Sequence, residues 1–453
     1  MIFKKILKKK IRKMKIESFY SKKIEVLYGK KRDLLEDVTL STYIHQPHLF
    51  KIQKRKNLTH LEVFTIDPEN SNDADDGFSF FHENNKLYLA IHIADPTHFI
   101  PLHSQLWKNI EMKITTKYPS NRDIISLLPK NLENICSLKT NNHQEKKIAI
   151  SIIWLIQEDT MLPSQPEIFF SDITIKKNNS FTYNNACPLK FSLCLQISKA
   201  IREKRLAESS SLTLSHSTSY IKYINSKPIL VQDSLNSKLF KEMISEFAIV
   251  TNGFIANILS DGIFRECNAQ RLEKFDLKEI IKNGIKAKYS NNKNPHDLVG
   301  LDKYCHFTSP IRRLPDCICH YLLKSLLFNI PKPFTEQQLN LLSKKCLDEI
   351  KKDKKIGFLD NKFRIFQYIQ ILLNQNENVE IEFYITKNTG LFINTIINKI
   401  NNHTVHVSYS LKKKNNNIIN LDNIYKIKIN TIDLLKENDE LPELDLFLSN
   451  LLN

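Results

Sequence analysis

Short segments rich in β-branched and aromatic residues occur throughout the first half of the chain. Residues 61–66 alternate between apolar and polar side chains, and an acidic loop separates them from the apolar residues 78–81. Longer apolar runs at 87–94 and 148–156 and a shorter one at 172–175 have the same character. Segments of this length and composition are typical of β-strands, so we expect a β-sheet in this half.

The middle of the chain repeats apolar residues at intervals of three and four, which is typical of amphipathic helices. This pattern covers residues 192–207 and a long stretch from residue 238 to residue 258. Residues 317–328 are apolar nearly all round and predict a buried helix. Residues 336–354 also follow helical spacing.

After about residue 376 the chain returns to alternating segments separated by turns rich in Asn and Lys. The predicted strands are residues 379–386, 391–400, 404–409 and 425–432. This rhythm fits a small five-stranded barrel of the OB type. The break at residues 374–378 predicts a domain boundary.

The chain is strongly basic. Its 453 residues include 66 Lys and Arg against 49 Asp and Glu, which gives a net charge of +17 and a pI of about 9.3. Such a surplus favours a polyanionic partner such as nucleic acid, although a solvated basic surface is the alternative. The most apolar stretch, residues 148–156, is far shorter than the ~20 residues of a spanning helix, so we expect no membrane segment.

The eight cysteines form no Cys-x-x-Cys pair. The sequence therefore predicts neither a zinc site nor a disulfide framework, and we expect the cytoplasm or another reducing compartment. Residues 1–15 contain eight Lys or Arg and no acid. A basic arm that binds RNA phosphates, an organelle-targeting segment and a frayed terminus all fit this composition.

An acidic loop at residues 67–77 reverses the basic character locally, with five acids and no base. Carboxylates this close repel one another unless they are solvated or bridged by cations, and oxygen ligands suit Mg²⁺ or Mn²⁺. A calcium EF-hand is excluded, because with Asp67 first the sixth position is Asn72 and the twelfth is Phe78. A solvated acidic turn is the alternative.

A second cluster of polar residues lies at residues 304–316. Ser309-Pro310 is a signal for the start of a helix, and Arg312 and Arg313 follow it directly. Helix N-termini bind anions, and guanidinium groups match phosphate oxygens. A pair of surface arginines without a function is the alternative.

Together the two clusters resemble the ribonuclease II/ribonuclease R/exosome-exonuclease family, whose catalytic part is the RNB domain. Residues 64–76 resemble the T-I-D-x5-D-x-D-D block of that family, and residues 306–313 resemble its H-F-T-S-P-I-R-R block. The resemblance covers about residues 50–372. Weaker similarities are the H-I-A-D strand at 92–95, the M-L-P…C-S-L segment at 127–138, and the E-x5-N pattern at Glu246 and Asn252.

The resemblance implies an α+β fold in three parts. Residues 51–375 would form the RNB-type catalytic domain, a mixed β-sheet wrapped by helices around a central RNA channel. Residues 376–453 would form a small, degenerate OB-like β-barrel that binds RNA. Residues 1–50 would be a basic extension without room for the two cold-shock barrels of bacterial members.

The resemblance also implies a function and a site. The expected activity is Mg²⁺-dependent 3′-to-5′ hydrolysis of single-stranded RNA to nucleoside 5′-monophosphates, with Mn²⁺ as another possible cofactor, by a monomer. The metal ligands would be Asp67, Asp73, Asp75 and Asp76. Asp75 would be the acid most critical for hydrolysis, and Arg312 would offset charge on the scissile phosphate. The RNA contacts would be Tyr118, Glu246, Thr308, Ser309, Arg312 and Arg313.

Departures from the family pattern leave other interpretations open. Gly77 replaces a usual Ala, and Leu314 and Pro315 stand where an aromatic and a variable residue are common. An RNB-type protein that binds RNA without cleaving it, and a metal-dependent endonuclease or DNA-directed enzyme, are the competing hypotheses. The presence of all four acids favours the active exoribonuclease.

Overall fold

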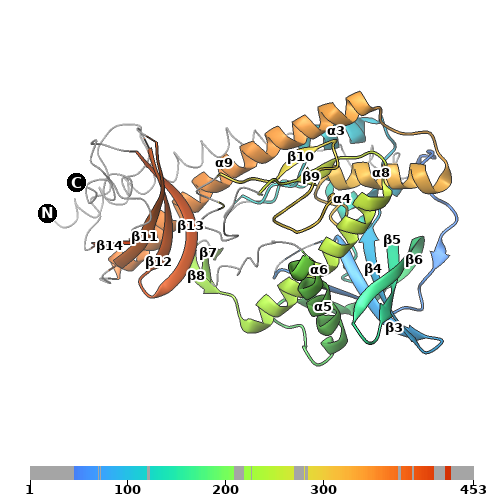
Figure 1. The fold of residues 1–453 in the computed structure, drawn as a ribbon, viewed down its shortest axis with the longest axis horizontal. Coiled ribbons are helices and arrows are strands. Elements are labelled where there is room, and N and C mark those ends of the chain that lie inside the picture. Colours follow the sequence, from blue (N-terminus) through green and yellow to red (C-terminus); the bar gives the residue numbers. More distant parts are fainter. Residues whose placement is uncertain are drawn as a thin grey trace.

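The structure is a computed structural model (Figure 1). It describes residues 45–69, 71, 73–119, 123–208, 219–225, 227–269, 280, 284–375, 379–389, 392–412 and 424–429. The expected N-terminal extension at residues 1–50 therefore lies almost wholly outside the described residues. Within the described ranges, no helix is long and apolar enough to cross a membrane.

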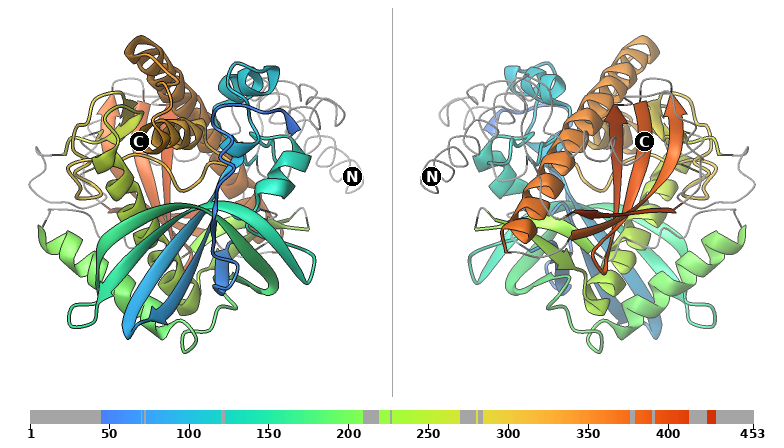
Figure 2. Two further views of the ribbon diagram at one scale, coloured as in Figure 1. Left: turned by 90° about the vertical axis from the view of Figure 1, so that its right-hand side faces the viewer. Right: turned by 90° about the vertical axis from the view of Figure 1, so that its left-hand side faces the viewer.

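The main sheet is mixed and closes on itself through its longest strand. Its strands are β1 (Lys56–Asn57), β2 (Val63–Asp67), β3 (Asp76–Glu83), β4 (Lys86–Ala94), β5 (Gln144–Gln157) and β6 (Leu162–Thr182). The first part of β6 pairs antiparallel with β5, and its later part pairs parallel with β1 and β2. Because β2, β3, β4 and β5 pair in succession, the pairings form a ring, whose strands fan out in Figure 2. The predicted strands are confirmed, and the last is far longer than expected.

Helices cover this sheet through aromatic contacts. The predicted helices are confirmed as α5 (Ser192–Glu208), α6 (Leu235–Ile258), α8 (Leu314–Phe328) and α9 (Glu336–Asn374). On α6, Phe247 packs against Phe78 of β3, and Phe254 packs against Trp154 of β5. The apolar face of α6 therefore covers the sheet, as its spacing predicts.

The other helices are short, whereas α9 is longer than predicted. The sequence did not indicate the 3₁₀ turn η1 (Pro96–His98), α3 (Gln105–Lys113) or α4 (Lys130–Cys136). A capping box between Thr335 and Gln338 begins α9, which continues twenty residues past the predicted end at residue 354. Figures 1 and 2 show α9 reaching the C-terminal strands.

The C-terminal strands form a four-stranded antiparallel sheet. They are β11 (Val379–Thr389), β12 (Phe392–Ile400), β13 (His403–Lys412) and β14 (Ile424–Ile429), in the order β13-β12-β11-β14. The predicted strands are thus present, but a fifth strand and closure into a barrel are not shown in the described ranges. The sequence did not indicate two further antiparallel pairs. One joins β7 (Ser219–Ile224) to β8 (Lys227–Gln232), and the other joins β9 (Phe264–Glu266) to β10 (Lys288–Ser290).

A buried ion network joins the end of β4 to α8. The Asp95 carboxylate accepts hydrogen bonds from Arg55 Nη2 and Lys324 Nζ, each at 2.8 Å, and from the Thr97 hydroxyl. Burial alone would raise the pKa of Asp95, but the charges of Lys324 and Arg55 outweigh it, and the pKa lies far below its usual value. The Asp of the H-I-A-D motif is therefore a structural residue.

We expect Asp95→Ala to lower the free energy of unfolding by about 3–5 kcal/mol, because it leaves two buried cations without their counter-charge. Urea unfolding followed by the fluorescence of Trp107 and Trp154 measures this loss. The control is Asp261→Ala, which removes an exposed pair with Lys332 and should cost about 0–1 kcal/mol. Equal losses in the two variants would contradict the structural role of Asp95.

Candidate active site

A cavity of about 570 Å³ brings the two sequence clusters together. It lies where the acidic loop between β2 and β3 meets α6 and the segment before α8. Among the predicted site residues, those that line it are Asp67, Asp73, Asp75, Asp76, Tyr118, Thr308, Ser309, Arg312 and Arg313. Only Glu246 of the predicted set is not among the lining residues.

The acidic loop is anchored at both ends and in its middle. Asp67 ends β2 and Asp76 begins β3, so the two neighbouring strands fix these acids. Between them, the Ala74 N–H donates to Ser137 Oγ at 3.0 Å, and the Ala74 carbonyl accepts from the N–H of Leu138 at 2.9 Å. The segment that resembles the family's C-S-L block therefore holds the residue that separates Asp73 from Asp75.

The Asp75 carboxylate joins the acidic loop to the segment that carries the arginines. Its Oδ1 accepts from the N–H of Ile311 at 2.7 Å, and its Oδ2 accepts from Arg312 Nε at 2.9 Å. Arg312 Nη2 also donates to Ser309 Oγ at 2.8 Å. Asp75 is only 6% exposed, whereas the Arg312 side chain is 41% exposed. The guanidinium is thus fixed on one edge and accessible from the cavity.

The segment that carries the arginines is supported from two helices. Asn252 on α6 accepts from the N–H of Phe307 at 2.9 Å. Asp316, in the first turn of α8, accepts from the N–H of Ser309 and from Arg313 Nη2, each at 2.8 Å. The bonds to Phe307 and Ser309 fix the backbone before Pro310, and the bond from the Ile311 N–H to Asp75 fixes it after Pro310.

The departures from the family pattern fit their surroundings. A Cβ at Gly77 would lie 3.0 Å from the carbonyl oxygen of Phe64, so the close approach of β3 to β2 suits a residue without a side chain. Arg313 is the N-cap of α8, and Leu314 and Pro315 begin the helix. Leu314 is fully buried, and Pro is favourable at the start of a helix.

Burial disfavours the charged forms of the four acids. Burial raises the pKa of Asp75 to about 7 and that of Asp76 to about 6, although Arg312 opposes both shifts. Burial, and then the charge of Asp76, raise the pKa of Asp67 well above its usual value. Burial also raises the pKa of Asp73. A bound cation would favour the charged forms of these buried carboxyl groups.

The donor chemistry of the loop fits a divalent cation. The donors are carboxylate oxygens, which suit Mg²⁺ and Mn²⁺. Asp67 Oδ2 is buried without a hydrogen-bond partner, which leaves a carboxyl oxygen available to a metal ion. In the part of the chain that the structure describes, no three His, Cys, Asp or Glu side chains are already gathered as a metal site. The four-carboxylate ligand set stays a prediction.

Tyr118 and Glu246 occupy different environments. The segment before Tyr118 runs beside the arginines, since the N–H of Thr116 donates to the Arg312 carbonyl at 3.0 Å. Tyr118 is 54% exposed and faces the cavity. Glu246 is 3% exposed, and both of its carboxylate oxygens accept from Arg205. Its predicted RNA contact stays a prediction.

Several cavity residues were not predicted as part of the site. Tyr183 follows β6 and donates its N–H to the Asp67 carbonyl, and Glu69 and Tyr304 also line the cavity. Glu69 lies in the acidic loop and Tyr304 in the second cluster, but neither was assigned a role. Tyr183 is isolated in the sequence, so no local pattern could identify it. Asn252 was visible as the Asn of E-x5-N, but its role as an anchor of the Phe307 backbone appears only in the structure.

A family model and two curated proteins are similar to this chain in sequence. The family model described as the RNB domain matches residues 55–285 and 276–329. Exoribonuclease 2 of Buchnera aphidicola subsp. Schizaphis graminum is 27% identical over 412 residues, which cover 73% of this chain and 62% of that protein. Ribonuclease R of Chlamydia pneumoniae is 27% identical over 371 residues, 69% of this chain and 53% of that protein. The chain thus spans little more than half the length of these relatives.

Solved structures share the fold. RNase R of Mycoplasma genitalium, in complex with ribose-methylated single-stranded RNA, superposes with a TM-score of 0.69 at 19% identity, over 91% of this chain and 76% of that one. Yeast Ssd1, described as a pseudonuclease, superposes with a TM-score of 0.59 at 14% identity, over 84% and 51%. The architecture therefore occurs in a nuclease and in a pseudonuclease, and side chains must decide the activity.

We expect Asp76→Asn to stabilise the metal-free chain at pH 8 by about 1–2 kcal/mol. The pKa of Asp76 is raised to about 6, so its carboxyl favours folding below pH 4, and this contribution is lost as the pH rises through 6. The gain in the variant should therefore vanish near pH 4. Urea unfolding in EDTA across this range measures it.

Two comparisons complete that test. Asp159→Asn, an exposed acid in the turn after β5, should leave the pH dependence unchanged. Added Mg²⁺ should stabilise the native chain more than the Asp76→Asn chain. A native chain whose stability does not respond to Mg²⁺ would contradict the metal site.

Proposed function

Because the chain belongs to the RNB domain family, whose members are typically metal-dependent, we propose that it is a Mg²⁺-dependent 3′-to-5′ exoribonuclease acting on single-stranded RNA. Its products would be nucleoside 5′-monophosphates. The observation that carries the proposal is the contact of Asp75 with Ile311 and Arg312, which places the acidic loop and two arginines in one cavity. The chain is homologous to exoribonucleases at 27% identity.

The acids would hold the metal and the arginines would hold the phosphate. Mg²⁺ bound by Asp67, Asp73, Asp75 and Asp76 would activate water and stabilise the leaving oxygen. The open edge of Arg312 would bind the scissile phosphate and offset the charge that develops there. Fixing this guanidinium in advance through Asp75 and Ser309 removes the cost of ordering it during the reaction.

The remaining lining residues would position the end of the RNA. The exposed ring of Tyr118 would stack on a base, and Thr308, Ser309 and Arg313 would contact the backbone of the RNA. Glu246, which is held by Arg205, would contact the RNA end. We propose residues 51–375 as the catalytic domain around an RNA channel. The basic residues 1–50 and an OB-like domain at residues 376–453 would add RNA contacts in a monomer.

The second candidate is an RNB-type protein that binds RNA and cleaves it weakly or not at all. The structural likeness to the pseudonuclease Ssd1 favours it. The complete acid set and the Arg312 contact favour the enzyme. The two candidates predict opposite results with labelled RNA.

We expect the chain with Mg²⁺ to release labelled monomers at once from 3′-labelled single-stranded RNA. With 5′-labelled RNA it should leave progressively shorter strands, and EDTA should stop both reactions. Resolving the products by length tests the activity and its direction. Intact RNA would support the pseudonuclease, and internal fragments would indicate an endonuclease.

In the same assay, Asp75→Asn should abolish monomer release while RNA affinity changes by less than about threefold, because affinity rests on basic and aromatic contacts. Asn keeps an oxygen that can accept from the Ile311 N–H, so the fold should persist. The control Asp159→Asn should cleave like the native chain. Normal cleavage by the Asp75→Asn chain would refute the catalytic role of Asp75.

We expect Arg312→Lys to lower kcat by roughly 10²-fold with little change in KM, because a transition-state contact is lost. Lysine keeps the charge but cannot contact both Asp75 and Ser309 while facing the phosphate. The control is Arg202→Lys, at an ion pair with Glu242 on α5 and α6, which should be neutral. Unchanged turnover in Arg312→Lys would show that the guanidinium geometry is unimportant.

A further inference from the structure

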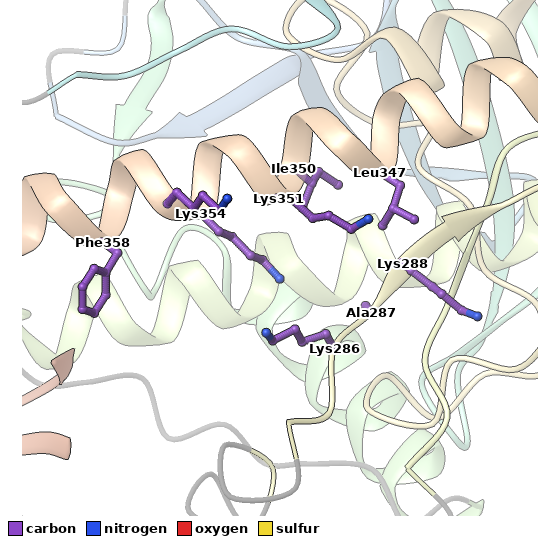
Figure 3. Close-up of a pocket in the computed structure, with 9 residues that line it drawn as sticks. Lys286, Ala287, Lys288, Leu347, Ile350, Lys351, Lys354 and Phe358 are labelled. Atoms are coloured by element: carbon purple, nitrogen blue, oxygen red, sulfur yellow. The ribbon is translucent and has the colours of Figure 1, made fainter. Parts of the chain in front are cut away.

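A second cavity, of about 780 Å³, lies between α9 and the segment that leads into β10 (Figure 3). Its charged lining is Lys286, Lys288, Lys351, Lys354 and Lys355, and we call it the lysine groove. Its apolar lining is Ala287, Leu347, Ile350 and Phe358. Figure 3 shows Lys351 and Lys354 extending from α9 toward the segment that carries Lys286. None of these residues lines the candidate active site.

The positive charge in the lysine groove is only partly compensated. Lys288 pairs with Glu266 at 2.7 Å, and Lys351 pairs with Asp348 at 3.1 Å. In the described ranges, no carboxylate lies within ion-pair distance of Lys286, Lys354 or Lys355. Such a cluster of like charges is unfavourable until an anion enters it.

The surroundings of Lys354 add to this imbalance. Partial burial, and then the charges of Arg265 and Lys286, lower the pKa of Lys354. Arg265 Nη1 is itself buried without a hydrogen-bond partner. Arg265 does not line the groove, but it adds positive charge beside Lys354.

The lining residues on α9 form a continuous stripe. Leu347, Ile350, Lys351, Lys354 and Phe358 recur at helical spacing on one face. At 1.5 Å per residue, the stripe is ~16 Å long. Amines that alternate with apolar and aromatic side chains along a groove are the features by which proteins bind single-stranded nucleic acid.

The groove is connected to the candidate active site through β10. Tyr289 follows Lys288 on this strand, and its hydroxyl lies 2.6 Å from His306 Nδ1. The guanidinium carbon of Arg265 lies 4.7 Å from the centre of the Tyr289 ring. His306 begins the segment that ends in Arg312 and Arg313. The groove therefore lies next to the residues that support the segment carrying Arg312 and Arg313.

We propose that the lysine groove binds the phosphate backbone of a single-stranded RNA segment that lies outside the catalytic cavity, with Phe358 stacked on a base. The inference rests on the proposed function, because it takes RNA as the substrate. A long RNA would occupy the cavity and the groove together, whereas a short oligomer would occupy the cavity alone. The groove would therefore favour long substrates through an effective-concentration effect.

The test compares two triple variants of equal charge, each made in the Asp75→Asn chain and measured in EDTA so that RNA stays intact. The groove variant is Lys286→Gln, Lys354→Gln and Lys355→Gln. The control is Lys86→Gln, Lys146→Gln and Lys176→Gln, which are exposed lysines of the main sheet. Affinity for a long and a short single-stranded RNA is measured at several salt concentrations.

We expect the groove variant to bind long RNA roughly tenfold or more weakly, with a salt slope lower by about 2, since each lost phosphate contact removes about 0.7 from the slope. Its affinity for short RNA should match that of the control. Equal affinity for long RNA in the two triple variants would overturn the inference while leaving the proposed function intact. Failure of the native chain to bind RNA of either length would overturn both.

A second variant separates RNA from a simple polyanion. Phe358→Leu keeps the groove charge but removes a stacking surface, so affinity for long RNA should fall about fivefold or more. Its affinity for inorganic polyphosphate should not change. Loss of polyphosphate and RNA affinity in the lysine variant, with no effect of Phe358→Leu on RNA, would make the groove a general anion site and overturn the RNA assignment.

Discussion

The contact of the Asp75 carboxylate with the Ile311 N–H and the Arg312 guanidinium joins residues 236 and 237 positions apart in the chain. Other residues of the candidate site hold the two segments that make this contact. Ser137 fixes the acidic loop through Ala74, and Asn252 fixes the arginine segment through Phe307. Without the contact, the acidic and basic walls of the cavity would have no fixed spacing.

Two kinds of buried charge are visible in this molecule, and they differ in how fully they are compensated. Asp95 is paired on two sides by Arg55 and Lys324 and stays ionised, so its role is to fasten α8 to the sheet. Asp67 and Asp75 are also buried or half-buried, but burial raises their pKa values. Incompletely compensated acids in a cavity are a feature of functional sites.

The chain has a net charge of +17, and the positions of its charged side chains bear on function. Five acids lie together in the loop at residues 67–77, and five lysines line the lysine groove beside β10. The acidic loop would repel an RNA backbone unless cations were bound, whereas the groove would attract it with or without metal. Because the same architecture occurs in a nuclease and in a pseudonuclease, these side chains, and not the fold, must define what the chain does.

The sequence determined the elements with strong local patterns and the two residue clusters that meet in the cavity. The apolar run of β4, the buried helix α8 and the two motifs were all recognisable, because periodicity and motif chemistry are local properties. The length of β6 was not, since its Asn- and Lys-rich later part lacks alternation. Only the tertiary structure placed Tyr183 in the cavity and paired Glu246 with Arg205. It also brought Lys286 close to Lys354. Such contacts depend on how distant segments pack together, and no local sequence pattern predicts that packing.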